Sequence, residues 1–366
     1  MVQSAQGNHS DAQKGMEMPW SGVINQYREM INLPPNVPVI TLLEGNTPLI
    51  PLPALGRILG KGVTLYAKFE GLNPTGSFKD RGMTVAISEA AGRGAKSVIC
   101  ASTGNTAASA AAYASRSGIR CIVLIPQGKV AMGKLAGALA YGSKVIQIEG
   151  SFDDALTLVV QISQKQSIAL VNSLNPFRLE GQKTAAFEIC DAIGKSPDWL
   201  CLPVGNAGNI TAYWMGFQQY HHIKKTGLPR ILGVQAEGAA PLVVGHPVEP
   251  ETVATAIRIG KPARGEQALE AAQESGGRII AVSDNAILEM QSHLAAEGLW
   301  VEPASAAGLA GLVHEVRTNR LIVDGQTIVT VCTGHGLKDP DIITRRAPSI
   351  QALPPILSEL EKALLE

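Results

Sequence analysis

The sequence predicts an α/β protein of two domains, each built on a mostly parallel, twisted sheet flanked by helices. Short apolar runs of strand length alternate with segments of helical periodicity along most of the chain. Thirty-eight glycines among 366 residues suit many tight turns between strands and helices. The alternation falls into two series, and we therefore expect two domains with a ligand cleft between them.

The first series begins after a tail rich in Gln, Ser, Asn and Gly at residues 1–18. Its strands are expected where apolar or alternating runs end at turn residues: 63–69, 97–101, 121–125, 144–148 and 168–171. Its helices are expected where apolar residues recur on one face or alanines cluster: 20–30, 79–92, 107–116, 134–141 and 152–164. We expect Ser77 to cap the helix that starts at Lys79.

The second series repeats the pattern with strands expected at 199–204, 230–236, 278–282 and 327–332. Its helices are expected at 187–193, 210–223, 284–297, 304–317 and 356–365. Several prolines and glycines in residues 238–277 predict short helices and loops. We expect residues 71–171 to form a smaller domain and residues 19–70 with 172–366 to form a larger one.

The composition excludes several classes of function. The 31 basic and 31 acidic side chains balance, so nothing indicates a nucleic-acid or membrane-surface partner. No apolar stretch is long enough to span a bilayer, and the N-terminus lacks the apolar core of a signal peptide. The five cysteines form no C-x-x-C pair and the seven histidines no H-E-x-x-H, so we expect no metal site and reduced, buried thiols in a cytoplasmic protein.

Lys79 is the candidate catalytic residue. It follows an expected strand and a turn made by Asn-Pro and Thr-Gly, at the start of an expected helix. The positive end of a helix and burial both disfavour an ammonium ion and lower the pKa of a lysine. A lowered pKa is what a lysine needs to form a Schiff base.

Two loops between a strand and a helix are candidate anion sites. Gly-Asn-Ala-Gly-Asn at residues 205–209 lets backbone N–H groups approach a phosphate closely. Ser-Thr-Gly-Asn-Thr at residues 102–106 adds hydroxyl and amide groups at another helix start, which suits a carboxylate or a phosphate. Thr333, at the end of the last expected strand, can place a hydroxyl near a ligand.

Several of these segments resemble one enzyme family. Asn-Pro-Thr-Gly-Ser-Phe-Lys-Asp-Arg-Gly-Met at residues 73–83 resembles the lysine segment of fold-type II pyridoxal-phosphate (PLP) enzymes, most closely that of the threonine synthase family. Glu-Gly-Asn-Thr-Pro-Leu at residues 44–49 resembles the entry segment of that family. Residues 205–209 resemble its phosphate loop, whereas related dehydratases carry four glycines there. The resemblance implies a tryptophan-synthase-β-like fold.

The resemblance also implies roles for individual residues. Lys79 would hold PLP as a Schiff base, Asn105 would lie beside its phenolic oxygen, and Thr333 would meet its pyridine nitrogen. The residues implied to bind the cofactor are Lys79, Phe78, Asn105, Gly205, Asn206, Ala207, Gly208, Asn209 and Thr333. Those implied to bind the carboxylate or phosphate of a substrate are Ser102, Thr103, Thr106, Asn172, Ser173 and Arg178. A lone arginine after a turn is usually solvated, but Arg178 can grip a phosphate with two parallel hydrogen bonds.

The implied reaction converts O-phospho-L-homoserine and water to L-threonine and phosphate, the last step of threonine biosynthesis, in a cytoplasmic homodimer. A serine/threonine dehydratase shares the lysine segment and eliminates from Cβ, without needing Arg178. A nucleotide-binding regulator is the alternative from another class. Residues 128–134 nearly match the P-loop pattern, but Leu135 stands where that pattern needs Ser or Thr. A purely structural role would leave the matching segments unexplained.

Overall fold

The computed structural model describes residues 19–102, 104–127, 132–346 and 352–365. The predicted tail at residues 1–18 lies outside this part of the chain. No helix within these ranges is both long and apolar enough to cross a membrane.

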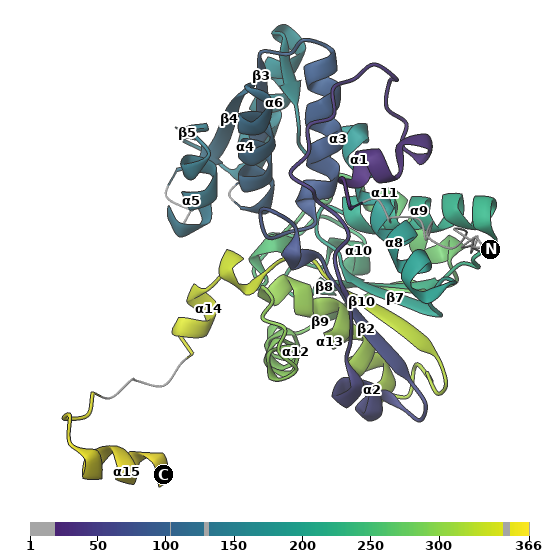
Figure 1. Cartoon of the computed structure of the whole chain (residues 1–366), viewed down its shortest axis with the longest axis vertical. Coiled ribbons are helices and arrows are strands. Elements are labelled where there is room, and N and C mark those ends of the chain that lie inside the picture. The colour runs from purple at the N-terminus through teal and green to yellow at the C-terminus, as the bar shows by residue number, and fades with distance from the viewer. Residues whose placement is uncertain (1–18, 103, 128–131, 347–351, 366) are drawn as a thin grey trace, which may run out of the picture.

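Ten strands in the described residues form two separate sheets (Figure 1). The larger sheet has the order β1-β2-β10-β7-β8-β9. Only β1 runs antiparallel to its neighbour there, whereas β2, β10, β7, β8 and β9 pair in parallel. Its strands are β1 (Leu49–Pro51), β2 (Thr64–Phe69), β7 (Trp199–Pro203), β8 (Arg230–Ala236), β9 (Arg278–Val282) and β10 (Thr327–Cys332).

The smaller sheet is parallel throughout and has the order β5-β4-β3-β6. Its strands are β3 (Ser97–Ala101), β4 (Arg120–Pro126), β5 (Lys144–Ile148) and β6 (Ile168–Leu170). The fold is therefore the predicted α/β class with parallel-dominated sheets. The smaller sheet takes its strands from one continuous segment, and the larger sheet takes its strands from both sides of that segment. The exact domain boundaries at residues 71 and 171 stay a prediction.

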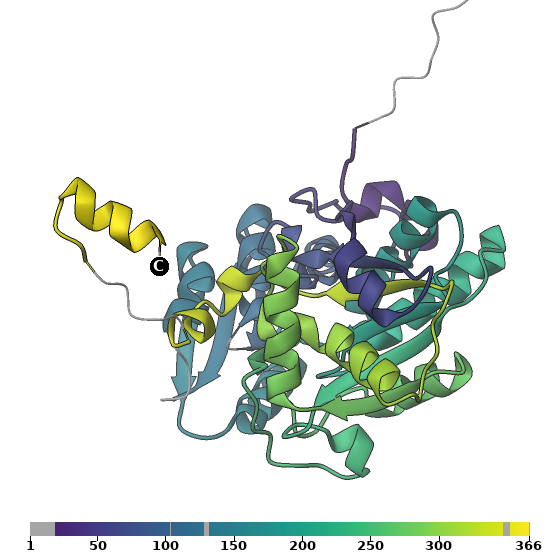
Figure 2. The same ribbon diagram turned by 90° about the horizontal axis from the view of Figure 1, so that it is seen from below.

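Helices cover both sheets (Figures 1 and 2). The α-helices are α1 (Val23–Gln26), α2 (Pro53–Leu59), α3 (Lys79–Gly92), α4 (Asn105–Ser117), α5 (Met132–Ala140), α6 (Phe152–Lys165), α7 (Pro176–Gln182), α8 (Thr184–Ile193), α9 (Gly208–Lys224), α10 (Pro241–Val244), α11 (Gly265–Glu274), α12 (Asp284–Ala296), α13 (Pro303–Arg317), α14 (Asp341–Thr344) and α15 (Leu357–Leu365). Short 3₁₀ turns are η1 (Arg28–Met30), η2 (Glu70–Leu72), η3 (Thr255–Ile257) and η4 (Gly336–Lys338).

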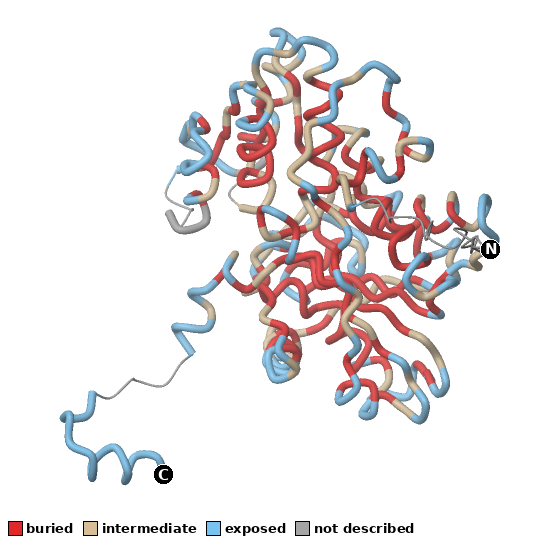
Figure 3. Tube along the Cα trace, in the orientation of Figure 1, coloured by how far each residue is buried: buried red, intermediate tan, exposed pale blue. Residues whose placement is uncertain are grey.

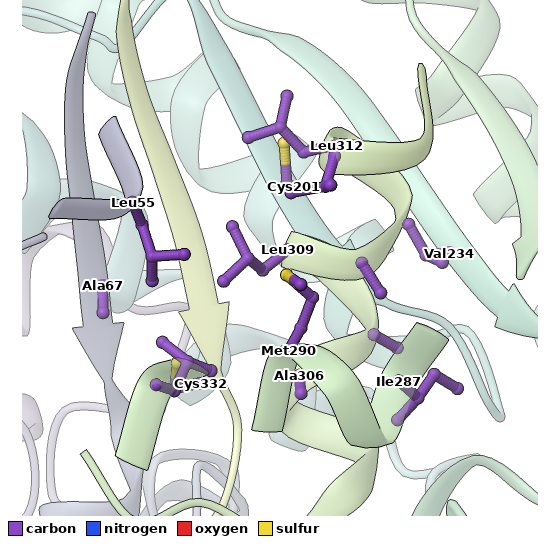
Figure 4. Packing of buried hydrophobic residues seen from close by; sticks show 14 of the residues in the cluster. Leu55, Ala67, Cys201, Val234, Ile287, Met290, Ala306, Leu309, Leu312 and Cys332 are labelled. Carbon is purple, nitrogen blue, oxygen red and sulfur yellow. The ribbon is translucent and has the colours of Figure 1, made fainter. Parts of the chain in front are cut away.

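The larger sheet separates two hydrophobic clusters, and strand β10 contributes to both. Ile328 and Cys332 face the cluster that includes α12 and α13, whereas Val329 and Val331 face the cluster under α8 and α9. This alternation is the period of two expected of a strand that is buried on both faces. Figure 4 shows part of the first cluster, and Figure 3 shows buried residues running through the centre of both sheets while α15 is exposed.

The structure corrects one local prediction and adds helices that were not predicted. Ser77 does not cap α3; Phe78 occupies the N-cap position and makes no side-chain cap bond. The Asn-Pro step at residue 175 begins a helix that was not predicted. The Asn175 side chain accepts a hydrogen bond from Phe177 N and Pro176 starts α7, an ordinary role for proline in the first helical turn. Helix α2, also started by a proline, was not predicted.

Candidate active site

A cavity of about 510 Å³ is lined by residues that follow strands of both sheets and by residues at the starts of three helices. Ala101 ends β3 and Pro203 ends β7, whereas α3, α4 and α9 begin at the cavity wall. Ligands of parallel α/β proteins bind at this carboxyl edge of the strands. Every predicted site residue within the described ranges lines the cavity. Thr103 lies outside those ranges.

Lys79 is the first residue of α3 and is half-buried at the cavity wall. Its Nζ lies 3.9 Å from the centroid of the Phe78 ring. Burial, and next the positive charge of Arg178, lower the pKa of Lys79 to about 7, while Glu302 acts in the opposite direction. A substantial fraction of the Lys79 amine is therefore neutral near pH 7, as a nucleophile or a base requires.

A buried ionic network fixes the start of α3. Arg81 Nε donates to Glu70 at 2.6 Å, and Arg81 Nη1 donates to Glu188 at 2.6 Å. Lys68 Nζ donates to Glu188 at 2.7 Å. Burial alone would raise the pKa of Glu188, but Arg81 and Lys68 outweigh it and hold that pKa at about 2. These ion pairs hold the lysine segment against the larger sheet through Arg81, two residues after Lys79.

The same network explains residues 44–49, for which the sequence alone gave no chemistry. Thr47 Oγ1 donates to Glu70 at 2.7 Å and accepts from Arg81 Nη2 at 3.0 Å. The carbonyl of Thr47 accepts from Lys68 Nζ at 2.6 Å. This segment is therefore a support for the α3 start rather than a direct part of the cavity wall.

The loop at residues 205–209 leads from β7 into helix α9, which is 17 residues long. Ala207 has a φ of 65°, a left-handed conformation that turns the loop sharply into the helix. The first N–H groups of a helix have no partner within it, and here they belong to residues lining the cavity. Nδ2 of Asn209 is buried without a hydrogen-bond partner, and Asn209 also lines the cavity. This arrangement is a suitable cradle for a phosphate group.

The loop at residues 102–106 leads into α4. Ser102 Oγ accepts from the N–H groups of Gly104 at 3.3 Å and Ala107 at 3.2 Å. Asn105 Nδ2 instead donates across the cavity to Glu302, at 3.0 Å from Oε1 and 3.2 Å from Oε2. Thr333 directly follows β10, and its hydroxyl oxygen lies 2.9 Å from that of Ser305 in α13. Ser102 holds the helix start, and Asn105 and Thr333 face the same space.

Asn172 and Arg178 both line the cavity, but the Asn172 amide already has hydrogen-bond partners on both sides, whereas Arg178 has a free donor. The Asn172 amide pairs with the backbone of Ala101, donating to its carbonyl and accepting from its N–H, each at 2.9 Å. Arg178 is buried, donates to the carbonyl of Val171 at 3.3 Å, and has no hydrogen-bond partner for Nε. No carboxylate pairs with Arg178 within the described residues. Burial lowers the pKa of Arg178 to about 10, so it carries its charge at neutral pH.

Known proteins match most of this chain. Residues 40–334 match the family model described as pyridoxal-phosphate dependent enzyme. The threonine synthase of Synechocystis sp. is 59% identical over 325 residues, which cover 88% of this chain and 84% of the relative. The threonine synthase of Halalkalibacterium halodurans is 53% identical over 349 residues, covering 95% and 97%.

The chain belongs to the threonine synthase family of PLP-dependent enzymes. Among solved structures, the processed form of threonine deaminase isoform 2 from Solanum lycopersicum superposes with a TM-score of 0.71 at 23% identity, covering 82% of each chain. That likeness shows the shared fold alone.

The cavity of this threonine synthase family member fits PLP. The loop at residues 205–209 and the unpartnered Asn209 amide suit the cofactor phosphate, and Lys79 has the lowered pKa required of a carbonyl-binding amine. Thr333 places its side chain at the wall of the same cavity. A volume of about 510 Å³ lies within the range of small-molecule sites. The individual roles of these residues stay predictions.

Sequence reasoning missed several charged residues that line the cavity, among them Glu302 and Lys338, and it missed Arg264 beside the cavity. Glu302 precedes α13, Lys338 lies in η4, and Arg264 donates to the carbonyls of Ser173 at 3.1 Å and Leu174 at 3.2 Å. Arg264 falls in residues 238–277, where the sequence carried no matching motif. The sequence signal that could have pointed to Glu302 is its position directly before the proline that starts a helix. The loop at residues 128–131, central to the nucleotide-binding alternative, lies outside the described residues.

Proposed function

We propose that this protein is a threonine synthase, converting O-phospho-L-homoserine and water to L-threonine and phosphate. Its membership of the threonine synthase family supports the activity. The cavity supports a substrate that carries a phosphate of its own, because it offers a second anion site besides the loop at residues 205–209. The proposed partner is thus a small molecule with an ammonium, a carboxylate and a phosphate ester.

The observation that carries the proposal is the buried guanidinium of Arg178. A buried cation without an anionic partner is costly, and burial already lowers the pKa of this arginine. A bound phosphate would accept a hydrogen bond from Nε of Arg178, and its negative charge would compensate the positive charge of the guanidinium. The Arg264 side chain donates hydrogen bonds to the backbone carbonyls of residues 173–174, close to Arg178 in sequence. These bonds fix the cavity wall around Arg178. A dehydratase acting on serine or threonine has no phosphate to place there.

PLP, when bound, supplies an electron sink for negative charge that develops at the substrate carbons. Lys79 would take the proton from Cα, because a substantial fraction of its amine is neutral near pH 7 and it lies at the cavity wall. The same amine would then take a proton from Cβ, deliver one to Cγ after phosphate has left, and return one to Cα. The Cγ–O bond breaks, phosphate leaves, and water adds its oxygen to Cβ. The product is threonine, whose methyl group is the former Cγ.

The other cavity residues would bind and orient the substrate. Arg178, with Asn172 and Ser173 beside it, would hold the phosphate that leaves. Ser102 and Thr106 at the start of α4 would hold the carboxylate, aided by the positive end of that helix. The N–H groups of residues 205–209 would hold the cofactor phosphate, and Thr333 would meet the ring nitrogen. Substrate and cofactor phosphates thus take separate sites.

The test is an assay of the purified, PLP-loaded protein with two substrates. With O-phospho-L-homoserine, the proposal predicts phosphate and threonine in equal amounts. With L-threonine, it predicts little 2-oxobutyrate. Production of 2-oxobutyrate without phosphate release would assign the protein as a dehydratase and leave the role of Lys79 intact.

We also propose that the protein acts in the cytoplasm as a homodimer, as the family resemblance implies. All five cysteines are free and buried, which suits a reducing compartment. Light scattering coupled to gel filtration tests the dimer directly. A mass of one 38.4 kDa chain would contradict it.

A further inference from the structure

Asn105 and Glu302 form a hydrogen bond across the cavity, although 197 residues separate them. Asn105 starts α4, which packs beside the smaller sheet, and Glu302 precedes α13, which packs against the larger one. The two Nδ2···Oε distances are 3.0 and 3.2 Å, so one amide nitrogen serves both carboxylate oxygens. The contact therefore joins the two halves of the fold within the site.

The residues around Glu302 hold its carboxylate in this contact with Asn105. Its side chain is buried, and Asn105 provides the hydrogen bonds it receives within the described part of the chain. Gly334 makes room for it, because a Cβ at that position would lie 2.7 Å from Cδ of Glu302. The backbone of Glu302 is held as well, since its N–H donates to the Gly334 carbonyl at 3.1 Å. A carboxylate so enclosed has little freedom to turn away.

The chemistry of this pair determines which way the Asn105 amide points. An ionised carboxylate only accepts hydrogen bonds, so the NH₂ group of Asn105 must face Glu302. One hydrogen of that NH₂ group then remains for the cavity, on the same nitrogen. Without the carboxylate, the amide could rotate by 180° and present its oxygen, which would repel an anionic oxygen on a ligand.

We propose that Glu302 is a positioning residue that fixes the Asn105 amide with an N–H directed at the phenolic oxygen of PLP. Only the identity of the cofactor, and not the substrate, is carried over from the proposed function. Glu302 acts through Asn105 and need not touch PLP or substrate. The bond also makes the cofactor site depend on the relative placement of α4 and α13.

Several charges face this pair from the elements packed around it. Burial raises the pKa of Glu302, the hydrogen bond from Asn105 lowers it, and the positive charges of Lys338 and Lys79 lower it further. Asp339 acts in the opposite direction. Lys338 is itself held, because its Nζ donates to the carbonyl of Thr75 at 2.9 Å. Burial outweighs these charges and leaves the pKa of Glu302 above its ordinary value, so the hydrogen bonds from Asn105 Nδ2 to both carboxylate oxygens are what favours the ionised form.

The test compares PLP-loaded Glu302→Gln, Asn105→Ala and the double variant with wild type. The readouts are the wavelength of the PLP visible absorption band and kcat. Glu302→Gln is expected to shift the band and to lower kcat about 10- to 100-fold, by analogy with the loss of a group that orients a metal-ligating side chain. Because Glu302 acts through Asn105, adding Glu302→Gln to Asn105→Ala should change neither readout further. Glu249→Gln, which removes one exposed carboxylate, is the control.

Gly334→Ala provides a second variant, because it displaces the carboxylate while keeping its charge. It should shift the absorption band in the same direction as Glu302→Gln. A band and kcat equal to those of wild type in Glu302→Gln would overturn the proposal, as would effects that add fully in the double variant. If wild type makes no threonine while Glu302→Gln still shifts the band, the proposed function fails and the positioning role stands.

Discussion

The guanidinium of Arg178 and the amine of Lys79 face one cavity, and the charge of Arg178 adds to burial in lowering the pKa of Lys79 to about 7. One arginine therefore serves two purposes in the proposed reaction. It is a free cation for the substrate phosphate, and together with burial it allows a substantial fraction of the Lys79 amine to be neutral near pH 7. When phosphate binds Arg178, its negative charge should oppose that second effect and raise the proton affinity of Lys79.

Replacement of Lys79 tests the catalytic assignment. We expect Lys79→Ala to lose threonine formation by more than about 10²-fold, because the substitution removes the amine that is proposed as the base. The PLP visible band should be lost as well. Lys96→Ala, at an exposed position, is the matched control. Turnover comparable to wild type in Lys79→Ala would remove Lys79 from the mechanism.

Replacement of Arg178 tests the phosphate site. We expect Arg178→Ala to raise KM for O-phospho-L-homoserine by about 30-fold or more, since a buried charged hydrogen-bond donor is lost. PLP binding should persist, because the cofactor phosphate occupies the loop at residues 205–209. Titration of the apoprotein with PLP checks this point. If Arg178→Ala cannot bind PLP, the residue has a structural role instead.

The pKa of Lys79 predicts a pH dependence for PLP uptake. Only the neutral amine can attack the PLP carbonyl, so the rate of uptake by the apoprotein should rise with pH through a midpoint near 7. Arg178→Met removes a positive charge that lowers this pKa, and its midpoint should therefore move to higher pH. Stopped-flow absorbance at several pH values measures both. A midpoint near the ordinary lysine value in wild type would contradict the burial of a neutral amine.

Two asparagines of the cavity should behave differently when truncated. Asn209 has a buried Nδ2 without a partner, whereas both amide groups of Asn172 are bonded to Ala101. Asn209→Ala should leave the stability of the apoprotein near wild type and weaken PLP binding by about 10-fold or more. Asn172→Ala should instead lower the free energy of unfolding by about 1–3 kcal/mol. Urea unfolding and PLP titration of both variants give the comparison, and equal losses of stability would contradict it.

The Arg81 network predicts both a mutational and an acid effect on stability. Arg81→Met leaves Glu70 and Glu188 buried with fewer cations, which should cost about 3–5 kcal/mol of unfolding free energy. The pKa of Glu188 is lowered in the folded state, so its contribution to stability is present above its ordinary pKa of 4.5 and is lost as pH falls toward 2. Urea unfolding between pH 5 and 3 should show a decline in wild type. A decline of equal size in Glu188→Gln would exclude Glu188 as its source.

The parts of the fold and the site that could be predicted are those that depend on local sequence patterns. Alternating apolar runs gave the strands, and the residues around Lys79 and the loop at 205–209 carried their own signals. The Glu302–Asn105 contact could not be predicted because its partners lie 197 residues apart and no local pattern pairs them. Arg264 lies in irregular structure without a periodic pattern. Helix α7 was missed because Asn-Pro is as common in turns as at helix starts, so that only the capping bond of Asn175 distinguishes the two.

The central claim is that water adds at Cβ while phosphate leaves with the oxygen it already shares with Cγ. The direct test runs the reaction of O-phospho-L-homoserine in H₂¹⁸O and analyses both products by mass spectrometry. The account predicts one ¹⁸O in the hydroxyl group of threonine and none in the released phosphate. Label in the phosphate together with homoserine would show hydrolysis at phosphorus and contradict the account.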